Sequence, residues 1–136
     1  MTNRSEIENA IKSVYAARKA GDLDGTMKYF TDDVVFGLNA RGTGIPALAN
    51  ASVGKAEVTQ AMRDLIDNWR FDSWQIVSLV VEGDKVSLHS KVSVTCVSTK
   101  KTNELDLVDH ITFRDGKIAK FYQSTDTAQV MALATP

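Results

Sequence analysis

The chain of 136 residues has the length of one ordinary domain, and its 43% apolar residues are enough for a single buried core, so we expect one domain over residues 1–136. Its 16 Lys and Arg nearly balance its 17 Asp and Glu, which argues against a nucleic-acid partner. The single cysteine, Cys96, excludes an intramolecular disulfide and fits a reducing compartment. With neither a secretory signal nor an apolar run of membrane-spanning length, we expect a cytoplasmic protein without a membrane partner.

Helical signals come first in the chain. Ser5 followed by Glu8 predicts a capping box, and apolar residues then recur at helical spacing as far as a stop signal at Gly21. Asp22 can cap a second, short helix over residues 23–30. Two consecutive helices are therefore predicted before any strand.

A short strand, an irregular segment and a longer helix follow. Residues 34–38 are β-branched and aromatic and predict a strand, whereas the glycines and proline of residues 39–54 predict irregular structure. Residues 55–68 carry an apolar stripe at helical spacing and predict a helix lying on a sheet.

The remaining sequence, from residue 72 to 125, is strand-like and is interrupted by turn signals, of which Asp115-Gly116 is the strongest. It predicts a meander of four strands, followed by a short helix that Asp126 can cap. The element order ααβαββββα predicts an α+β fold with helices on one side of a mostly antiparallel sheet.

Alternation along these strands separates an apolar face from a polar face. His89 and His110 fall on the polar face, whereas Asp109 and Gln123 share the parity of the apolar face. The other residues predicted to face inward are Val86, Leu88, Ser90, Val92, Val94, Cys96, Leu105, Leu107, Ile111, Phe113, Ala119, Phe121 and Thr125.

Asp109 is the most informative of these residues, because a buried carboxyl is costly and its pKa rises on desolvation. If it is neutral, it could donate a hydrogen bond to an oxyanion; if it is ionised, it could act as a base. Two alternatives stay open: Asp109 bonds a nearby tyrosine or backbone group in the core, or a bulge turns it outward. The Gln123 amide and the Tyr15 phenol could reach the same cavity, or could simply be satisfied within the core.

No cofactor or metal is expected. The Gly42-Thr43-Gly44 segment lacks the rest of a dinucleotide motif, and Gly54-Lys55 lacks the rest of a phosphate loop. The two histidines do not have the spacing of a zinc site. Cys96 shares its face with no histidine, so we interpret it as a small core residue.

Several segments of the chain resemble the nuclear transport factor 2-like superfamily, in its SnoaL-like and ketosteroid isomerase-like branch. The segments are 20–25 (AGDLDG), 29–36 (YFTDDVVF), Gly54-Lys55, Asp109-His110, 113–118 (FRDGKI) and 126–128 (DTA). The resemblance implies a cone-shaped fold in which a curved sheet wraps around helices and encloses an apolar cavity, commonly in a homodimer. Members include isomerases, polyketide cyclases, dehydratases and proteins that only bind or assemble.

The same resemblance implies roles for individual positions. The neutral oxyanion-hole aspartate of the isomerases falls on Asp109. Their oxyanion tyrosine falls on Val14 and their general base on Leu38, so neither of those roles is retained, and Tyr15 could substitute only if the first helix were rotated. The acidic group of the cyclases falls on Gln123, which cannot take up a proton.

We therefore expect a homodimer with a pocket for a small, largely apolar, oxygen-bearing molecule. In an isomerase, cyclase or dehydratase acting on an apolar carbonyl compound, Asp109 would carry the proton or donate to the oxyanion. The alternative is a non-catalytic ligand-binding or interaction module, which the absence of a second inward carboxylate or histidine favours. The expected lining is Val14, Tyr15, Phe30, Leu38, Met62, Trp69, Val92, Leu107, Asp109, Phe121 and Gln123.

Overall fold

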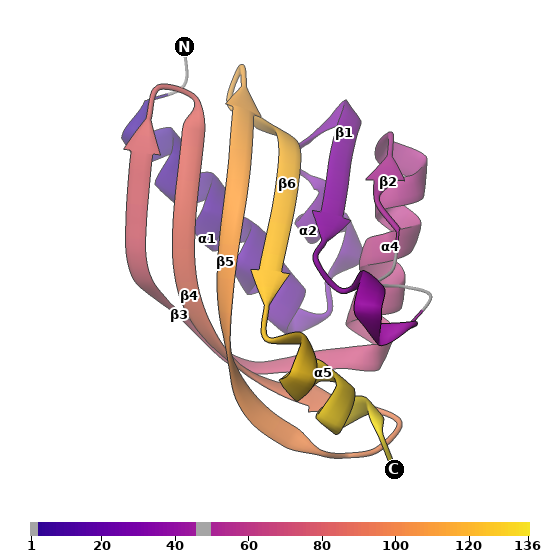
Figure 1. Ribbon diagram of the computed structural model, residues 1–136. Helices are drawn as coiled ribbons and strands as arrows, with labels where there is room; N and C mark the ends of the chain where they lie inside the picture. Colours follow the sequence, from indigo (N-terminus) through magenta and orange to yellow (C-terminus); the bar gives the residue numbers. More distant parts are fainter. Residues whose placement is uncertain (1–2, 46–49) are drawn as a thin grey trace.

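The computed structural model describes residues 3–45 and 50–136, in which helices pack against one face of an open, curved sheet (Figure 1). Part of the segment predicted to be irregular, residues 46–49, lies outside the described residues. The elements are α1 (Arg4–Ala20), α2 (Leu23–Met27), β1 (Phe30–Leu38), the 3₁₀ turn η1 (Arg41–Thr43), β2 (Ser52–Val53), α4 (Lys55–Asn68), β3 (Trp69–Glu82), β4 (Lys85–Cys96), β5 (Thr102–Arg114), β6 (Lys117–Thr125) and α5 (Thr127–Ala134).

The sheet has six strands in the order β2-β1-β6-β5-β4-β3. The predicted meander is confirmed, because β3 to β6 pair successively and antiparallel. The β1 strand pairs in parallel with β6, so the first long strand of the chain lies beside the last. This gives an α+β fold with a mixed sheet, and α1 crosses behind β3, β4 and β5 (Figure 1).

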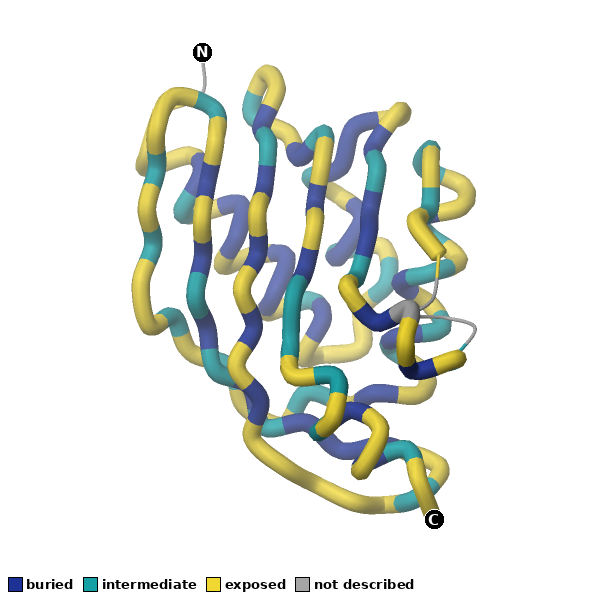
Figure 2. The backbone as a smooth tube through the Cα atoms, in the orientation of Figure 1, coloured by how far each residue is buried: buried dark blue, intermediate teal, exposed yellow. Residues whose placement is uncertain are grey.

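Alternating burial along the strands is visible in Figure 2, and it confirms the predicted faces of β4 and β5. One prediction for β6 is wrong: Ala119 is only half-buried, whereas Ile118 is fully buried. The reason is a register shift between Thr112 and Phe113 in the β5–β6 pairing, which changes the parity at the start of β6.

The first helix begins earlier than the sequence predicts. Its N-cap is Asn3, whose side chain accepts a hydrogen bond from the backbone N–H of Glu6 at 2.9 Å and donates one to the Glu6 carboxylate at 2.9 Å. This reciprocal pair differs from a capping box, because the Glu6 carboxylate accepts from the Asn3 side-chain amide and not from the N-cap backbone N–H. It places the N-cap two residues before the predicted one at Ser5. The predicted stop is confirmed, because Gly21 adopts a left-handed φ of 72°.

The second helix is shorter than predicted, and β1 is longer. Asp22 caps α2 as predicted, but the helix ends at Met27. The backbone joins the sheet at Phe30, which is the register partner of Ile118 on β6. Pairing with β6 outweighs the weak helical signal of these residues.

The core lies between the sheet and the helices. The largest side chains that are completely buried include Phe30, Phe113, Ile7, Ile11 and Leu88.

Among the described residues, no helix is both long and apolar enough to cross a bilayer.

Candidate functional site

Asp109 lies on β5 with its side chain in the core, and its exposed fraction is 0%. Its register partners are Leu88 on β4 and Gln123 on β6, so the carboxyl projects from the middle of the sheet towards the helices. Alternation along β5 produces this placement, as the sequence predicts, and no bulge turns the side chain outward.

Two side chains hold the Asp109 carboxyl. The Tyr15 hydroxyl of α1 forms a short hydrogen bond with Oδ2, and Nε2 of Gln123 lies 3.0 Å from Oδ1. The same Nε2 lies 3.1 Å from the Tyr15 hydroxyl oxygen, so the three groups form a closed triangle. Since an amide nitrogen carries two hydrogens, Gln123 can donate to both partners at once.

Burial perturbs both titratable groups in the triangle. Desolvation raises the pKa of Asp109 from 3.8 to about 7, although the hydrogen bonds from Tyr15 and Gln123 act in the opposite direction. Desolvation, followed by the nearby Asp109 carboxylate, raises the pKa of Tyr15 well above its ordinary value of 10.0. Near neutral pH the phenol is therefore neutral, while Asp109 populates both of its forms.

The protonation state of Asp109 decides which way the Tyr15 proton points. When Asp109 is ionised, the phenol proton is donated to Oδ2, and no donor of the triangle is left over. When Asp109 is protonated, it donates to the phenol oxygen, which also accepts from Gln123. The phenol proton is then free for another acceptor. A neutral Asp109 thus turns Tyr15 into an available hydrogen-bond donor.

A cavity of about 70 Å³ lies next to this triangle, and Tyr15 and Gln123 line it. Nine of the eleven residues predicted to line a pocket line this cavity: Val14, Tyr15, Leu38, Met62, Trp69, Val92, Leu107, Phe121 and Gln123. The remaining lining residues are Arg18, Thr26, Phe36, Leu65, Phe71, Val94, Leu105, Thr125 and Val130. The described lining contains no carboxylate and no histidine.

Two residues of the predicted lining lie elsewhere. Phe30 is fully buried in the core, with its ring centroid 6.3 Å from that of Phe121. Asp109 lies behind the lining, and among the described residues only Tyr15 and Gln123 connect it with the cavity by hydrogen bonds. The hydrogen-bonded path from Asp109 to the cavity therefore runs through these two side chains.

The Tyr15 hydroxyl forms a hydrogen bond with Asp109. This is one of the alternatives that the sequence leaves open, in which Asp109 bonds a nearby tyrosine in the core, although the family resemblance aligns the oxyanion tyrosine with Val14. The Tyr15 ring is stacked on Trp74, with centroids 4.3 Å apart and planes 8° apart, which fixes the orientation of the phenol. Both Val14 and Tyr15 line the cavity.

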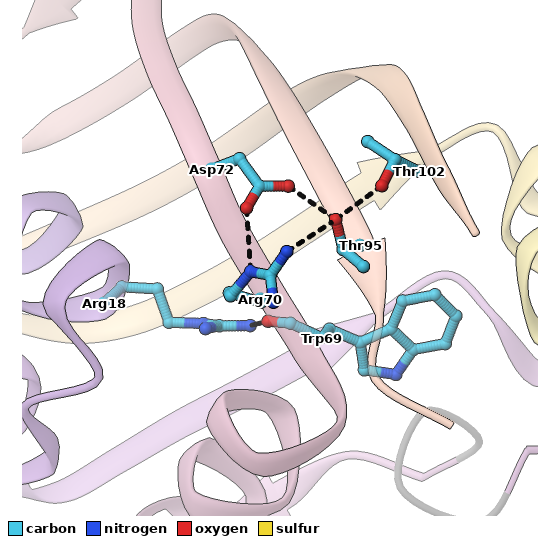
Figure 3. A network of polar contacts seen from close by, with 6 residues as sticks. All are labelled: Arg18, Trp69, Arg70, Asp72, Thr95 and Thr102. Atoms are coloured by element: carbon cyan, nitrogen blue, oxygen red, sulfur yellow. Dashed lines mark hydrogen bonds and ion pairs between the residues drawn. The ribbon is translucent and has the colours of Figure 1, made fainter. Parts of the chain in front are cut away.

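Arg18 is a site residue that the sequence prediction missed. It is buried, with an exposed fraction of 7%, and it lines the cavity. Its Nη2 donates to the backbone carbonyls of Leu65, at 2.9 Å, and of Trp69, at 2.7 Å; Figure 3 shows the second bond. The signal was its spacing, since Arg18 follows Val14 by four residues on the apolar stripe of α1.

A polar network fixes the start of β3, where the carbonyl that Arg18 contacts is located (Figure 3). Asp72 accepts from the Thr95 hydroxyl at 2.6 Å and from Nε of Arg70 at 2.8 Å. These two bonds lower the pKa of Asp72. The network ties β3 to β4 one residue beyond Trp69 and so supports that end of the cavity.

The two histidines lie on the polar face of the sheet, as predicted. Nε2 of His89 is 2.9 Å from the Asp106 carboxylate, and Nδ1 of His110 is 3.3 Å from the Ser87 hydroxyl. Within the part of the chain that the structure describes, no three His, Cys, Asp or Glu side chains are grouped so that they could hold a metal ion. Cys96 is buried, and its thiol is 3.5 Å from the Ser98 hydroxyl.

Solved structures share this architecture. A Bacillus subtilis protein provisionally classed as an isomerase superposes with a TM-score of 0.88 at 15% identity, covering 98% of this chain and 96% of that one. A Xanthomonas campestris protein provisionally classed as a polyketide cyclase gives 0.77 at 20% identity, covering 98% and 100%. A Catenulispora acidiphila protein with a ketosteroid isomerase-like fold, in complex with trimethylamine, gives 0.78 at 12% identity, covering 93% of each chain.

These likenesses define the fold as nuclear transport factor 2-like. A family model for the SnoaL-like domain matches residues 11–121, and the chain belongs to this family. No protein with a curated functional description matches the sequence.

Proposed function

We propose that the chain binds a small, largely apolar, oxygen-bearing molecule in the cavity beside Tyr15, and that Tyr15, with Asp109 behind it, polarises the carbonyl or enol oxygen of that molecule. The observation that carries this proposal is the closed triangle of Tyr15, Asp109 and Gln123 at the wall of an otherwise mainly apolar cavity. Isomerases, cyclases and dehydratases that act on carbonyl compounds all develop negative charge on such an oxygen.

The triangle is suited to stabilising that charge. A hydrogen bond to a developing oxyanion is strong in a site that excludes water, and a donor that is already oriented needs no reorganisation. The neutral form of Asp109 fixes the phenol oxygen from one side, and Gln123 fixes it from another. The phenol proton is then left for the ligand.

The size of the cavity limits the ligand to one ring at most. Its volume of about 70 Å³ is below that of a cavity of roughly 150 Å³, which accommodates benzene. A single ring therefore requires some movement of the walls. Met62 lines the cavity and can supply it, because its unbranched side chain adopts several shapes at low cost.

The test is a titration with 4-nitrophenol, whose absorbance reports both its binding and its ionisation. We expect the wild type to bind the phenolate near pH 7, where neutral Asp109 is still populated. Replacing Tyr15 by Phe removes the donor, and we expect it to weaken binding about tenfold or more, the effect of one hydrogen bond to a charged group. Tyr122→Phe is the matched control, because Tyr122 is exposed on the opposite face of the sheet. Equal binding by the wild type and Tyr15→Phe would contradict the proposal.

A second candidate function is a non-catalytic binding module with the same fold. One observation favours it: the described lining contains no carboxylate or histidine that could remove a proton from a carbon atom. Both candidates predict binding that depends on Tyr15. Turnover of enolisable ketones, monitored by exchange of their α-protons with deuterium in the presence of the protein, separates the two, since only the catalytic candidate predicts exchange that Tyr15→Phe abolishes.

We also propose that a second copy of the chain covers the outer face of the sheet. Val80, Ser87, His110 and Tyr122 are register partners across β3, β4, β5 and β6 and form a row on that face. Val80 and Tyr122 at the ends of this row are exposed by 61% and 48%, and a second copy on this face would remove their apolar surface from water. Sedimentation equilibrium of the wild type and of Val80→Asp tests this proposal, since the substitution should shift a dimer towards monomer.

A further inference from the structure

Arg18 carries a buried positive charge that no acidic side chain of the described residues neutralises. None of the ion pairs among the described residues includes it. Burial lowers the pKa of Arg18 to about 10, so the guanidinium remains charged at neutral pH. Burying a charge is unfavourable unless the charge is paired, and an unpaired arginine at the wall of a cavity therefore needs an explanation.

Contacts within the protein use only part of the hydrogen-bonding capacity of the Arg18 guanidinium. The two carbonyls that it contacts lie at the C-terminal end of α4, where the helix dipole supplies partial negative charge. The guanidinium carbon also lies 4.1 Å from the centroid of the Phe71 ring. Both hydrogen bonds use Nη2, and within the described residues neither Nε nor Nη1 has an acceptor. Two of the three nitrogens therefore remain available for a ligand in the cavity that Arg18 lines.

Arg18 and Tyr15 are three residues apart on α1, so they lie on the same side of the helix, about 5–6 Å apart at their Cβ atoms. Both line the cavity, and the surface between them is apolar apart from Gln123 and two threonines. One small molecule can therefore contact the guanidinium and the phenol together.

We infer that the ligand of this cavity is an anion, namely a single-ring or similarly small apolar carboxylate with a second oxygen, in which Arg18 binds the carboxylate and Tyr15 contacts the carbonyl or hydroxyl oxygen. This inference rests on the proposed function and narrows it, because a neutral ketone or phenol would leave the Arg18 charge unpaired. A planar guanidinium binds a carboxylate through two parallel hydrogen bonds, which makes arginine well suited to this role.

The experiment compares 4-hydroxybenzoate with 4-hydroxybenzamide, which has nearly the same shape but no charge. Both are titrated calorimetrically into the wild type, Arg18→Met, Arg18→Lys and Tyr15→Phe at pH 7. Arg63→Met is the matched control, because Arg63 is exposed on α4. Thermal melts establish that each variant is folded.

We expect the wild type to bind the benzoate at least tenfold more tightly than the benzamide. Arg18→Met should remove this preference and leave the affinity for the benzamide within about threefold, whereas Arg18→Lys should restore part of the preference. Tyr15→Phe should weaken both probes. If Arg18→Met fails to fold, the relative affinities of the wild type for the benzoate and the benzamide still decide whether the cavity prefers an anion.

The two proposals fail in different ways. If the benzamide binds as tightly as the benzoate and both depend on Tyr15, the anionic ligand is ruled out and the proposed function stands; Arg18 then serves only to cap α4. If neither probe depends on Tyr15, the proposed function itself is contradicted. A benzoate preference that survives in Arg18→Met would also overturn the role of Arg18.

Discussion

Asp109 and Gln123 are direct partners in the antiparallel pairing of β5 and β6, and their side chains meet at 3.0 Å on the inner face of the sheet. This pairing distinguishes the two oxygens of Asp109. Oδ1 accepts from the Gln123 amide, so the proton of neutral Asp109 resides on Oδ2, which faces the Tyr15 hydroxyl. The strand register thereby sets the direction in which neutral Asp109 donates its proton in a hydrogen bond, towards the Tyr15 hydroxyl.

Changing Gln123 to Glu is expected to place a second carboxylate directly opposite Asp109. Two buried carboxylates at this distance do not readily ionise together, so the pair keeps one shared proton. That proton is lost only at raised pH. We expect Gln123→Glu to be tolerated near pH 5 and to be destabilised by about 3 kcal/mol or more at pH 8, where a buried charge is left uncompensated. Urea denaturation at both pH values measures this. Gln75→Glu on the exposed side of β3 is the control and should change little.

Asp109 is expected to make the stability of the fold depend on pH. Its pKa is about 7 in the folded chain, against 3.8 for a free aspartate, so between these values the folded state binds more proton than the unfolded state. The contribution of Asp109 is therefore fully present below about pH 4 and is lost as the pH rises to about 7 and beyond. It amounts to at most roughly 4 kcal/mol, at about 1.4 kcal/mol per pKa unit.

Asp109→Asn lacks this titration, which makes it the natural comparison. The free energy of unfolding of the wild type minus that of Asp109→Asn should decrease between pH 4 and pH 8, while the contributions of all other titrating groups cancel. A difference that is constant over this range would show that Asp109 is not desolvated in the folded chain.

The position of the first helix cap gives a separate prediction. Asn3→Ala should lower stability by about 1 kcal/mol, because it removes the acceptor for the Glu6 N–H. Ser5→Ala is the matched control and should change stability by less than about 0.5 kcal/mol, since Ser5 is exposed and lies inside the helix. If Ser5→Ala were more destabilising than Asn3→Ala in thermal or chemical denaturation, the N-cap of α1 would be Ser5 and not Asn3.

Glycine is required at position 25 because a side chain there would collide with the Asp22 carboxylate that caps α2. The backbone conformation of Gly25 does not itself require glycine. A Cβ atom at this position would lie 2.4 Å from Oδ2 of Asp22, the side chain that caps α2 by accepting from the Gly25 N–H at 3.0 Å. Although alanine normally favours a helix over glycine, we expect Gly25→Ala to cost about 1 kcal/mol. The cost should be smaller in an Asp22→Ala background, and a double-mutant cycle measures that difference. Equal costs in both backgrounds would exclude the cap as the cause.

The sequence predicts the elements that depend on regular periodicity. The helix expected over residues 55–68 has these limits in the structure, because its apolar stripe repeats without interruption. Alternation alone predicts Asp109 on the inner face, and the prediction holds because β5 has no bulge on either side of that residue.

The features that the sequence does not predict depend on contacts between distant segments. The extension of β1 back to Phe30 requires its pairing with β6, and the altered parity at Ile118 requires a register shift in the β5–β6 pairing. The direction of Tyr15 is fixed by its stacking on Trp74, which lies far along the chain on β3. The spacing of Arg18 puts it on the apolar stripe of α1, but its two carbonyl partners become evident only once α4 and β3 are in position.

The parallel pairing of β1 with β6 makes the order of synthesis matter for this site. Leu38 of β1 is the register partner of Gln123 of β6, and both line the cavity. During synthesis, β1 can pair with β6 only after nearly the entire chain has been made. Contacts of such long sequence separation also form slowly. A fragment that ends before β6 lacks one wall of the cavity and the amide that orients Asp109, so the appearance of ligand binding during refolding would mark the moment at which the sheet is completed.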